Sequence, residues 1–343
     1  MDTSEFRKYG HDIVEWIARY FENVEQYPVK SGLLPGAVRG ALPDAPPRGG
    51  ESFERFMHDL DEIIMPGITH WQSPNFFAYF PANSSPPSVL AEMLTAALGT
   101  QCMIWETSPA AAELEEKMME WLRVMTGLPS EFEGVIQDSA SSATLAALIT
   151  AREKITRFRS NSEGLSDADR LRIYASTQAH SSVEKGAGVA GFGRKNLVRV
   201  AVRKDYSIDP EALEQAIEKD LASGFIPCCV VATLGTTGTT AIDPLKPVGE
   251  ICRKHGLWLH VDAALAGTAL LLPEMRWMTE GIEYVDSLVF NPHKWMFTNF
   301  DCSAFFVRDA SLLIRTFEIL PEYLKTRTRG EVNDYRDWGI PLG

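Results

Sequence analysis

Two apolar runs, CCVVATL at residues 228–234 and LWLHVD at residues 257–262, stand on either side of a segment near 244–255 where we expect a helix. Short apolar strands joined by a helix are typical of a β-α-β unit, in which the two strands run parallel and are buried on both faces. This stretch therefore predicts an α/β fold built on a mostly parallel sheet.

The same alternation extends over residues 86–343, which we predict to form one large domain. Ser108-Pro109 and Asp209-Pro210 each place a capping residue before a proline at the first helical position, so a helix should begin at both. The residues expected to face the core are Leu114, Met118, Trp121 and Met125 in the first of these helices and Leu213, Ile217 and Leu221 in the second. A third helix is predicted to run through Leu145 and Leu148. Further strands are predicted at 134–136, 286–290 and 303–307. The predicted architecture is a mostly parallel sheet sandwiched by helices.

Residues 1–85 have a different pattern, which predicts an N-terminal helical arm followed by a strap. Apolar residues spaced three and four apart form one helix face: Val14, Ile17, Phe21 and Val24. The following residues 27–50 are rich in proline and glycine, which favours an extended connection. Such an arm cannot bury its apolar face alone, so we expect it to pack on the large domain or on a second subunit.

The composition is that of an ordinary soluble globular protein, with 45% apolar and 23% charged residues. The formal charge of −13 argues against a nucleic-acid partner, because binding to phosphate backbones rests on clustered Lys and Arg. Five cysteines without framework spacing fit a reducing compartment. We see no secretory signal profile, and no apolar run approaches the roughly 20 residues that span a bilayer. We expect a cytoplasmic protein that does not associate with membranes.

Several polar residues follow predicted strands, where ligands gather in open α/β sheets. Ser139 and Ser141 lie between a strand and a helix, a position that suits an anion. Asp262 ends an apolar strand, His180 is followed by two serines, and Lys294 lies among apolar neighbours that can make its amine a nucleophile. Each residue alone has an ordinary structural explanation, such as a helix cap or a solvated lysine. Together they are the parts needed to hold a phosphorylated aromatic aldehyde.

Two other interpretations concern histidines. His260 shares a strand face with Asp262, and we interpret it as a core imidazole. A metal-dependent hydrolase is the alternative function, with ligands drawn from Cys252, His255, His260, Asp262 and His293. Cys252 and His255 fall on a predicted helix and no four-ligand spacing appears, so we expect no metal.

Over essentially its whole length the sequence resembles the group II pyridoxal-phosphate (PLP) decarboxylases, and specifically the aromatic L-amino acid decarboxylases. The motifs that carry the resemblance include HWQSPNFFAYFPA, IWETSPAAAELE, VIQDSASSATL, AHSSVEKGAG, VATLGTTGTT, LWLHVDAALAG and FNPHKWMFTNFDCS. The pairing of HVDAA with NPHKW, which places Asp262 32 residues before Lys294, is highly specific.

The resemblance implies a fold-type I PLP-dependent transferase-like domain and an obligate homodimer with active sites at the interface. It implies that Lys294 binds the cofactor, that Asp262 pairs with the ring nitrogen and that His180 stacks on the ring. The other cofactor contacts that it implies are Ser139, Ala140, Ser141 and Asn291 at the phosphate, with Thr237 and His293 nearby.

The resemblance also implies the substrate and the product. The residues of the implied pocket are large and mostly apolar, which suits an aromatic side chain: Trp71, Tyr79, Phe80, Pro81, Gln101 and Met103. Tyr323, in PEYLK, matches the residue that protonates the α-carbon and so yields an amine. Relatives with Phe there tend to make aldehydes, so an aromatic aldehyde synthase is the alternative within the family.

Three departures from the family pattern stand out. Ala82 replaces a Thr, and Leu265 replaces a common Tyr. The sequence ends at Gly343, within a motif that normally continues into a C-terminal small domain, and we expect that domain to be absent.

Overall fold

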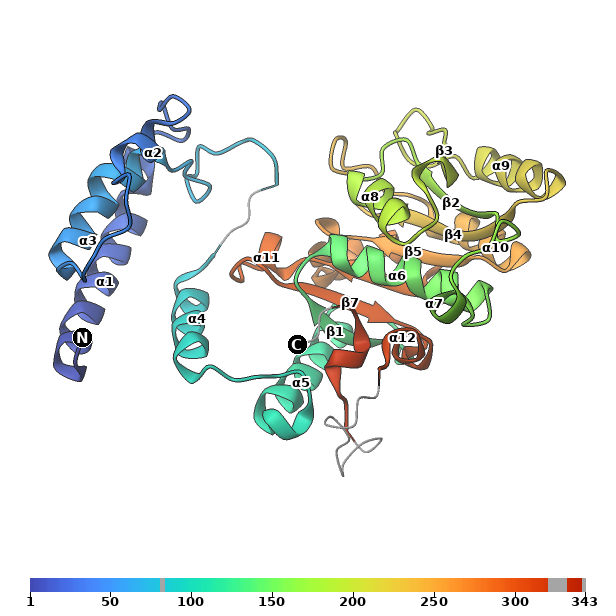
Figure 1. The fold of residues 1–343 in the computed structure, drawn as a ribbon. Coiled ribbons are helices and arrows are strands. Elements are labelled where there is room, and N and C mark those ends of the chain that lie inside the picture. The colour runs from blue at the N-terminus through green and yellow to red at the C-terminus, as the bar shows by residue number, and fades with distance from the viewer. Residues whose placement is uncertain (81–83, 320–331, 341–343) are drawn as a thin grey trace. The chain divides into compact units, whose positions relative to one another are not determined.

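The computed structural model describes residues 1–80, 84–319 and 332–340. The chain divides into two compact units, residues 1–82 and 83–343 (Figure 1).

The smaller unit is helical. Its elements are α1 (Thr3–Asn23), η1 (Val24–Gln26), α2 (Ala37–Ala41), α3 (Phe53–Asp59), η2 (Leu60–Ile64) and η3 (Met65–Gly67). Asp2 begins α1 with a capping box, and the predicted N-terminal helix is confirmed. The strap at 27–50 is not wholly extended as predicted, because Gly36 adopts a left-handed conformation and α2 follows it. Ring stacking of Tyr9 on Phe53, at 4.1 Å, joins α1 to α3.

The larger unit contains a seven-stranded sheet in the order β1-β7-β6-β5-β4-β2-β3. The strands are β1 (Glu133–Gln137), β2 (Leu171–Ser176), β3 (Leu197–Val200), β4 (Ile226–Thr233), β5 (Trp258–Asp262), β6 (Ser287–Phe290) and β7 (Ser303–Val307). Only β7 runs against its neighbours β1 and β6, so the mostly parallel sheet is confirmed. A strand before His180 is expected from the sequence, but no bounds are predicted for β2 and β3 is not identified, because Arg172 and Arg199 interrupt their apolar runs.

Helices cover both faces of this sheet. The helices of the larger unit are α4 (Pro86–Leu98), α5 (Pro109–Thr126), α6 (Ala140–Ile155), α7 (Ser160–Glu163), α8 (Ser181–Val189), α9 (Pro210–Ala222), α10 (Leu245–His255), α11 (Pro292–Trp295) and α12 (Ala310–Phe317). Short 3-10 segments are η4 (Trp105–Thr107), η5 (Arg194–Asn196), η6 (Ala266–Leu271), η7 (Pro273–Thr279), η8 (Ile282–Tyr284) and η10 (Tyr335–Trp338). Helices α5, α9 and α10 pack on one face, and α6, α8 and α12 pack on the other.

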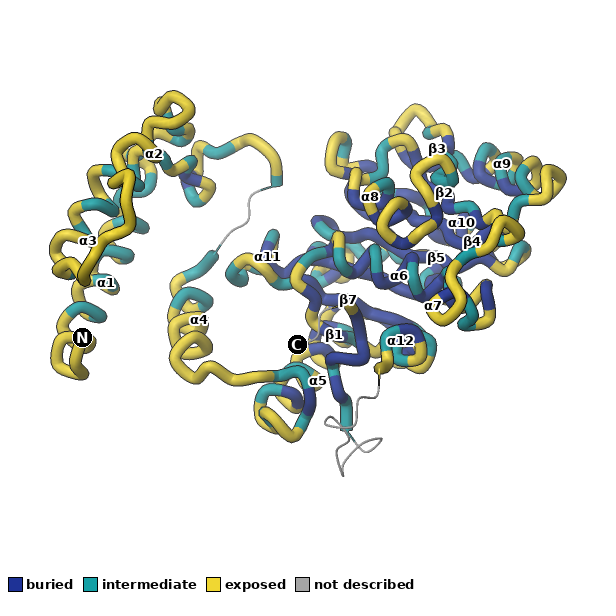
Figure 2. Tube along the Cα trace, viewed as in Figure 1, coloured by how far each residue is buried: buried dark blue, intermediate teal, exposed yellow. Residues whose placement is uncertain are grey.

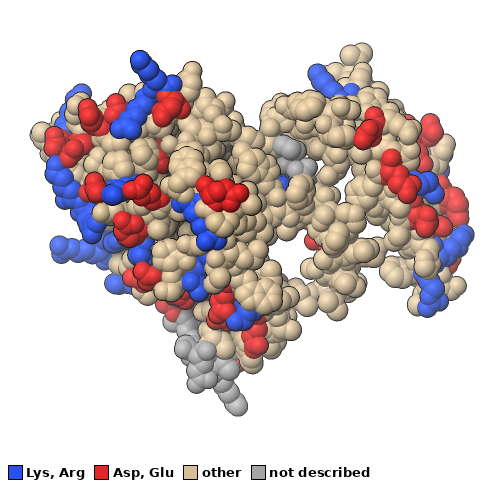
Figure 3. All heavy atoms as spheres, turned by 180° about the vertical axis from the view of Figure 1, so that it is seen from behind, with Lys and Arg blue, Asp and Glu red and all other residues tan. Residues whose placement is uncertain are grey.

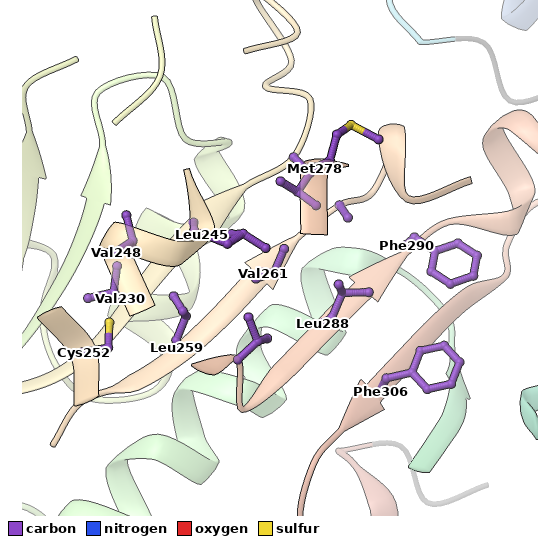
Figure 4. Close-up of a cluster of buried hydrophobic side chains, with 14 of the residues drawn as sticks. Val230, Leu245, Val248, Cys252, Leu259, Val261, Met278, Leu288, Phe290 and Phe306 are labelled. Atoms are coloured by element: carbon purple, nitrogen blue, oxygen red, sulfur yellow. The ribbon is translucent and has the colours of Figure 1, made fainter. Parts of the chain in front are cut away.

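Alternation along β5 assigns its side chains to these two faces. Leu259 and Val261 point into the core shared with α10, which Figure 4 shows. Trp258, His260 and Asp262 alternate with these residues, so their side chains point to the opposite face of the sheet, toward α6. The sheet is the deeply buried part of the molecule, whereas α1 and α4 bury no residue (Figure 2).

The predicted core face of α5 is wrong, although the helix begins at Pro109 as predicted. Its stripe of Leu114, Met118, Trp121 and Met125 is 37% to 61% exposed. The residues that α5 buries are Ala112, Met119, Leu122 and Thr126. Gly134 on β1 leaves room for Met119 to pack on the sheet, because a side chain at position 134 would overlap Met119 and Phe306. Likewise Leu221 on α9 is exposed rather than buried.

Two adjacent methionines test which face of α5 packs on the sheet. Met119→Ala should lower the free energy of unfolding by about 2–5 kcal/mol, because it empties a buried site. Met118→Ala, on the exposed face, should cost less than about 1 kcal/mol in the isolated subunit. Denaturant unfolding measures both values, and equal losses would contradict this packing.

Candidate active site

Five strand ends meet at one edge of the sheet. Strands β1, β2, β4, β5 and β6 run in the same direction, since β1 and β6 are both antiparallel to β7 and the others pair in parallel. The segments that follow them contain Ser139–Ser141, His180, Thr237, Asp262 and Asn291–Lys294. The topology therefore brings most of the residues predicted for a cofactor site to the same edge.

The end of β1 leads directly into the N-terminus of α6. Ser139 caps this helix, and its Oγ accepts a hydrogen bond from the Ser142 N–H at 3.2 Å. The first-turn N–H groups, including those of Ala140 and Ser141, have no acceptor within their own helix. Ala140 belongs to the same apolar cluster as Ala264, next to Asp262. This helix end offers an anion N–H groups, hydroxyls and a favourable dipole.

Asp262 is a carboxylate only 5% exposed at the end of β5. Its Oδ1 accepts a hydrogen bond from the Ala264 N–H at 3.1 Å. Burial raises the pKa of Asp262, while this hydrogen bond and the nearby charges of Lys294 and His180 lower it. These three side chains are thus close enough to interact electrostatically.

Lys294 lies on α11, which follows β6. The backbone N–H of Lys294 donates to the Asn291 carbonyl at 3.0 Å. The Asn291 side chain is held as well, because its Oδ1 accepts from the Ser303 hydroxyl at 2.7 Å. Burial lowers the pKa of the Lys294 amine below its usual 10.5, against the opposing effect of Asp262. A larger neutral fraction makes this amine a better nucleophile than a solvated lysine.

His180 caps α8 with its ring. Its Nδ1 accepts from the Ser182 N–H at 3.2 Å and lies 2.9 Å from the Ser182 hydroxyl. The residue remains exposed, and these contacts with Ser182 hold the orientation of its ring.

The remaining predicted cofactor contacts differ in exposure. Thr237 is exposed on the loop after β4, beside the buried Thr236. His293 is buried, and its Nδ1 accepts from the Cys302 N–H at 2.8 Å. That bond holds the His293 ring through Nδ1. Its role toward the cofactor stays a prediction.

The residues predicted to bind substrate fall in both units. Trp71 and Tyr79 stack at 5.7 Å in the smaller unit, which also contains Phe80. Gln101 and Met103 belong to the larger unit, where the Met103 carbonyl accepts from the Arg336 N–H at 3.0 Å. Pro81, Ala82 and Tyr323 lie outside the described residues. Leu265 is buried next to the start of η6.

The structure adds supporting residues and separates the metal ligand sets. Ser182 could have been inferred from its position beside His180, but Ser303 could not, because it comes from the antiparallel strand β7.

Cys252 is buried in the core, where burial raises the pKa of its thiol. Among the described residues, a metal-like group of three forms only from Glu214, Glu218 and His255, on α9 and α10. The ligand sets considered for a hydrolase are therefore not assembled.

Comparison with known proteins agrees with this geometry. Residues 35–343 match the pyridoxal-dependent decarboxylase conserved domain. The chain belongs to the pyridoxal-dependent decarboxylase family. Over its whole length it is 46% identical to an aromatic-L-amino-acid decarboxylase of Bos taurus, of which it covers 73%, and 42% identical to a phenylacetaldehyde synthase of Arabidopsis thaliana, of which it covers 71%. The solved structure of Oryza sativa TDC with PLP and tryptamine matches with a TM-score of 0.96 at 37% identity, over 100% of this chain and 72% of that one.

Membership of the pyridoxal-dependent decarboxylases confirms the predicted fold, makes the chain a carboxy-lyase and identifies its cofactor as PLP. The groups at the sheet edge fit that cofactor chemically. A helix N-terminus suits its phosphate, a buried carboxylate suits its ring nitrogen, and an amine of lowered pKa suits its aldehyde.

The lowered pKa of Lys294 predicts how cofactor uptake depends on pH. The neutral amine is the nucleophile, so the rate at which apo-protein takes up PLP should rise with pH through a midpoint below 10.5. In Asp262→Asn the midpoint should fall further, because the carboxylate that raises the pKa of Lys294 is gone. Stopped-flow absorbance measures these rates, and a wild-type midpoint at or above 10.5 would contradict the assignment.

Proposed function

We propose that this decarboxylase converts an aromatic L-amino acid to the corresponding arylalkylamine and carbon dioxide. The observation that carries the proposal is the position of Asp262, Lys294 and His180 after strands that end at one edge of the sheet, where Asp262 interacts electrostatically with each of the other two. The family relationship to an aromatic-L-amino-acid decarboxylase supports the substrate class.

The cofactor phosphate would be held at the start of α6, by the Ser139 and Ser141 hydroxyls and the backbone N–H groups around Ala140. The Asn291 Oδ1 is engaged by Ser303, so its amide nitrogen is the atom that could donate to an anion. Thr237 and His293 would complete the surroundings of the cofactor.

PLP supplies an electron sink for the bond that breaks at the α-carbon. The Asp262 carboxylate would hold a proton at the ring nitrogen, and a cation there favours its charged form despite burial. His180 would present its ring face in the orientation fixed by Ser182. Lys294 would supply the amine that binds the aldehyde.

The substrate side chain would contact aromatic residues. Trp71 and Tyr79 already stack on each other, and with Phe80 they offer flat apolar surface suited to an aryl group. Pro81, Gln101 and Met103 complete the proposed pocket. A glutamate side chain would instead need a cation, which this set does not contain.

Tyr323 would decide the product. A phenol can return a proton to the α-carbon and so yield the amine. The similarity to a phenylacetaldehyde synthase makes aldehyde formation the second candidate function.

We also propose a homodimer with active sites at the interface. Leu90, Leu94 and Leu98 on α4 are 54% to 73% exposed, and the apolar stripe of α5 is exposed as well. Apolar faces of this extent indicate a covering partner, and a second copy is the simplest one.

Acidic and basic side chains are interspersed on the surface shown in Figure 3. No helix within the described ranges is long and apolar enough to cross a membrane. We propose a cytoplasmic location.

A product assay tests the proposed reaction. With PLP added, phenylalanine, tyrosine, dopa, tryptophan and 5-hydroxytryptophan should be assayed for carbon dioxide and for amine, and at least one should yield both. Tyr323→Phe should lower amine formation by about 10²–10⁴-fold, because a general acid is lost. Aldehyde, ammonia and hydrogen peroxide should appear instead, with dissolved dioxygen consumed as the oxidant. Aldehyde as the main wild-type product would favour the synthase, and the absence of carbon dioxide from all five would contradict the proposal.

A charge on α4 tests the dimer. Leu94→Glu should reduce the mass measured by light scattering from twice 38.1 kDa toward 38.1 kDa, because it buries a carboxylate in an apolar interface. Glu92→Gln, at an exposed polar position of the same helix, is the matched control and should remain dimeric. A dimer that tolerates Leu94→Glu would show that this face is not the interface.

A further inference from the structure

A polar network crosses the core between the sheet and α6. The fully buried His260 on β5 lies with its Nε2 3.2 Å from the Thr144 hydroxyl on α6. Its Nδ1 lies 2.9 Å from the Ser287 hydroxyl on β6, which also accepts a hydrogen bond from Trp258 Nε1 at 2.9 Å. Both ring nitrogens of His260 therefore have partners on different elements.

The elements that meet at His260 are the ones that carry the site. Thr144 lies one helical turn after Ala140, at the proposed phosphate-binding end of α6. His260 precedes Asp262 by two residues on the same face of β5. Ser287 begins β6, the strand that leads into Lys294.

The chemistry of the network suits a device that sets position. Burial lowers the pKa of His260 to about 3, so the ring is neutral, with one nitrogen as donor and the other as acceptor. Phe305, whose ring lies 6.2 Å from that of His260, belongs to an apolar cluster with Val289 and Ala147, and contacts within such a cluster are non-directional. Hydrogen bonds are directional, so they can fix how far α6 lies along the strands in a way that apolar packing cannot.

We propose that His260 is a positioning residue that, through Thr144 and Ser287, sets the phosphate-binding end of α6 relative to Asp262 and Lys294. It does not touch the cofactor. It acts by keeping the anion site and the amine at the separation that one phosphorylated aldehyde can bridge. This inference rests on the proposed placement of the cofactor phosphate at α6.

Two buried threonines on α6 give a matched test. Thr144→Val removes the link to His260, whereas Thr150→Val removes a buried hydroxyl that bonds to the Ala146 carbonyl within the same helix, at 2.9 Å. The measurement is the affinity of apo-protein for PLP and for pyridoxal, which lacks the phosphate, by fluorescence titration. The ratio of the two affinities reports whether phosphate site and amine are correctly spaced, independently of activity.

Wild type and Thr150→Val should favour PLP strongly, and Thr144→Val should lose about tenfold or more of that preference, because small misplacements weaken multipoint binding. If Thr144→Val weakens both ligands equally, the network is merely structural and the inference is overturned. If wild type binds PLP and pyridoxal equally, the phosphate site itself is wrong, and the positioning role falls with it.

Replacements of His260 provide a second readout should Thr144→Val fold poorly. The amide of Gln reaches the place of Nε2 and can bond to Thr144, whereas the shorter Asn reaches the place of Nδ1 and Ser287. His260→Gln should therefore retain more of the preference for PLP than His260→Asn. The reverse order would overturn the role assigned to the link with α6.

Discussion

Asp262 holds a carboxylate at a nearly water-free position, which costs free energy unless cations or hydrogen-bond donors surround it. The groups around it come from different parts of the chain: the Ala264 N–H donor from the next turn, the Lys294 amine from the segment after β6 and the His180 ring from the start of α8. They converge because the strands before them run in parallel and end at one edge. The sheet topology is therefore what makes a buried charge tolerable at the end of β5.

The same burial shapes the behaviour of the site before the cofactor arrives. Burial raises the pKa of Asp262 and lowers that of Lys294, so it favours the neutral form of both, whereas their mutual attraction favours the charged forms. A ligand that brings its own cation to Asp262 and its own aldehyde to Lys294 satisfies both groups at once. PLP has both features, and its phosphate matches the anion site at the start of α6.

Much of this could be predicted from the sequence where the signal is local. The β4-α10-β5 unit was predicted correctly because its apolar runs are long and uninterrupted, and Asp262, Lys294 and His180 were predicted from their positions after strands. The α5 stripe was predicted wrongly because periodicity identifies an apolar face but not what covers it. His260 was correctly interpreted as a core residue, yet its partners Thr144 and Ser287 lie 116 and 27 residues away, and no local pattern points to them. The pocket that combines Trp71 with Gln101, and the role of Tyr323, stay predictions from family resemblance.

The most direct measurement of whether Lys294 holds the cofactor is borohydride reduction of the PLP-loaded protein, followed by proteolysis and mass spectrometry. The arrangement of Asp262, His180 and Lys294 predicts that the mass of the reduced cofactor appears on the peptide that contains Lys294. Its appearance on a peptide with another lysine, with the Lys294 peptide unmodified, would contradict the site described here.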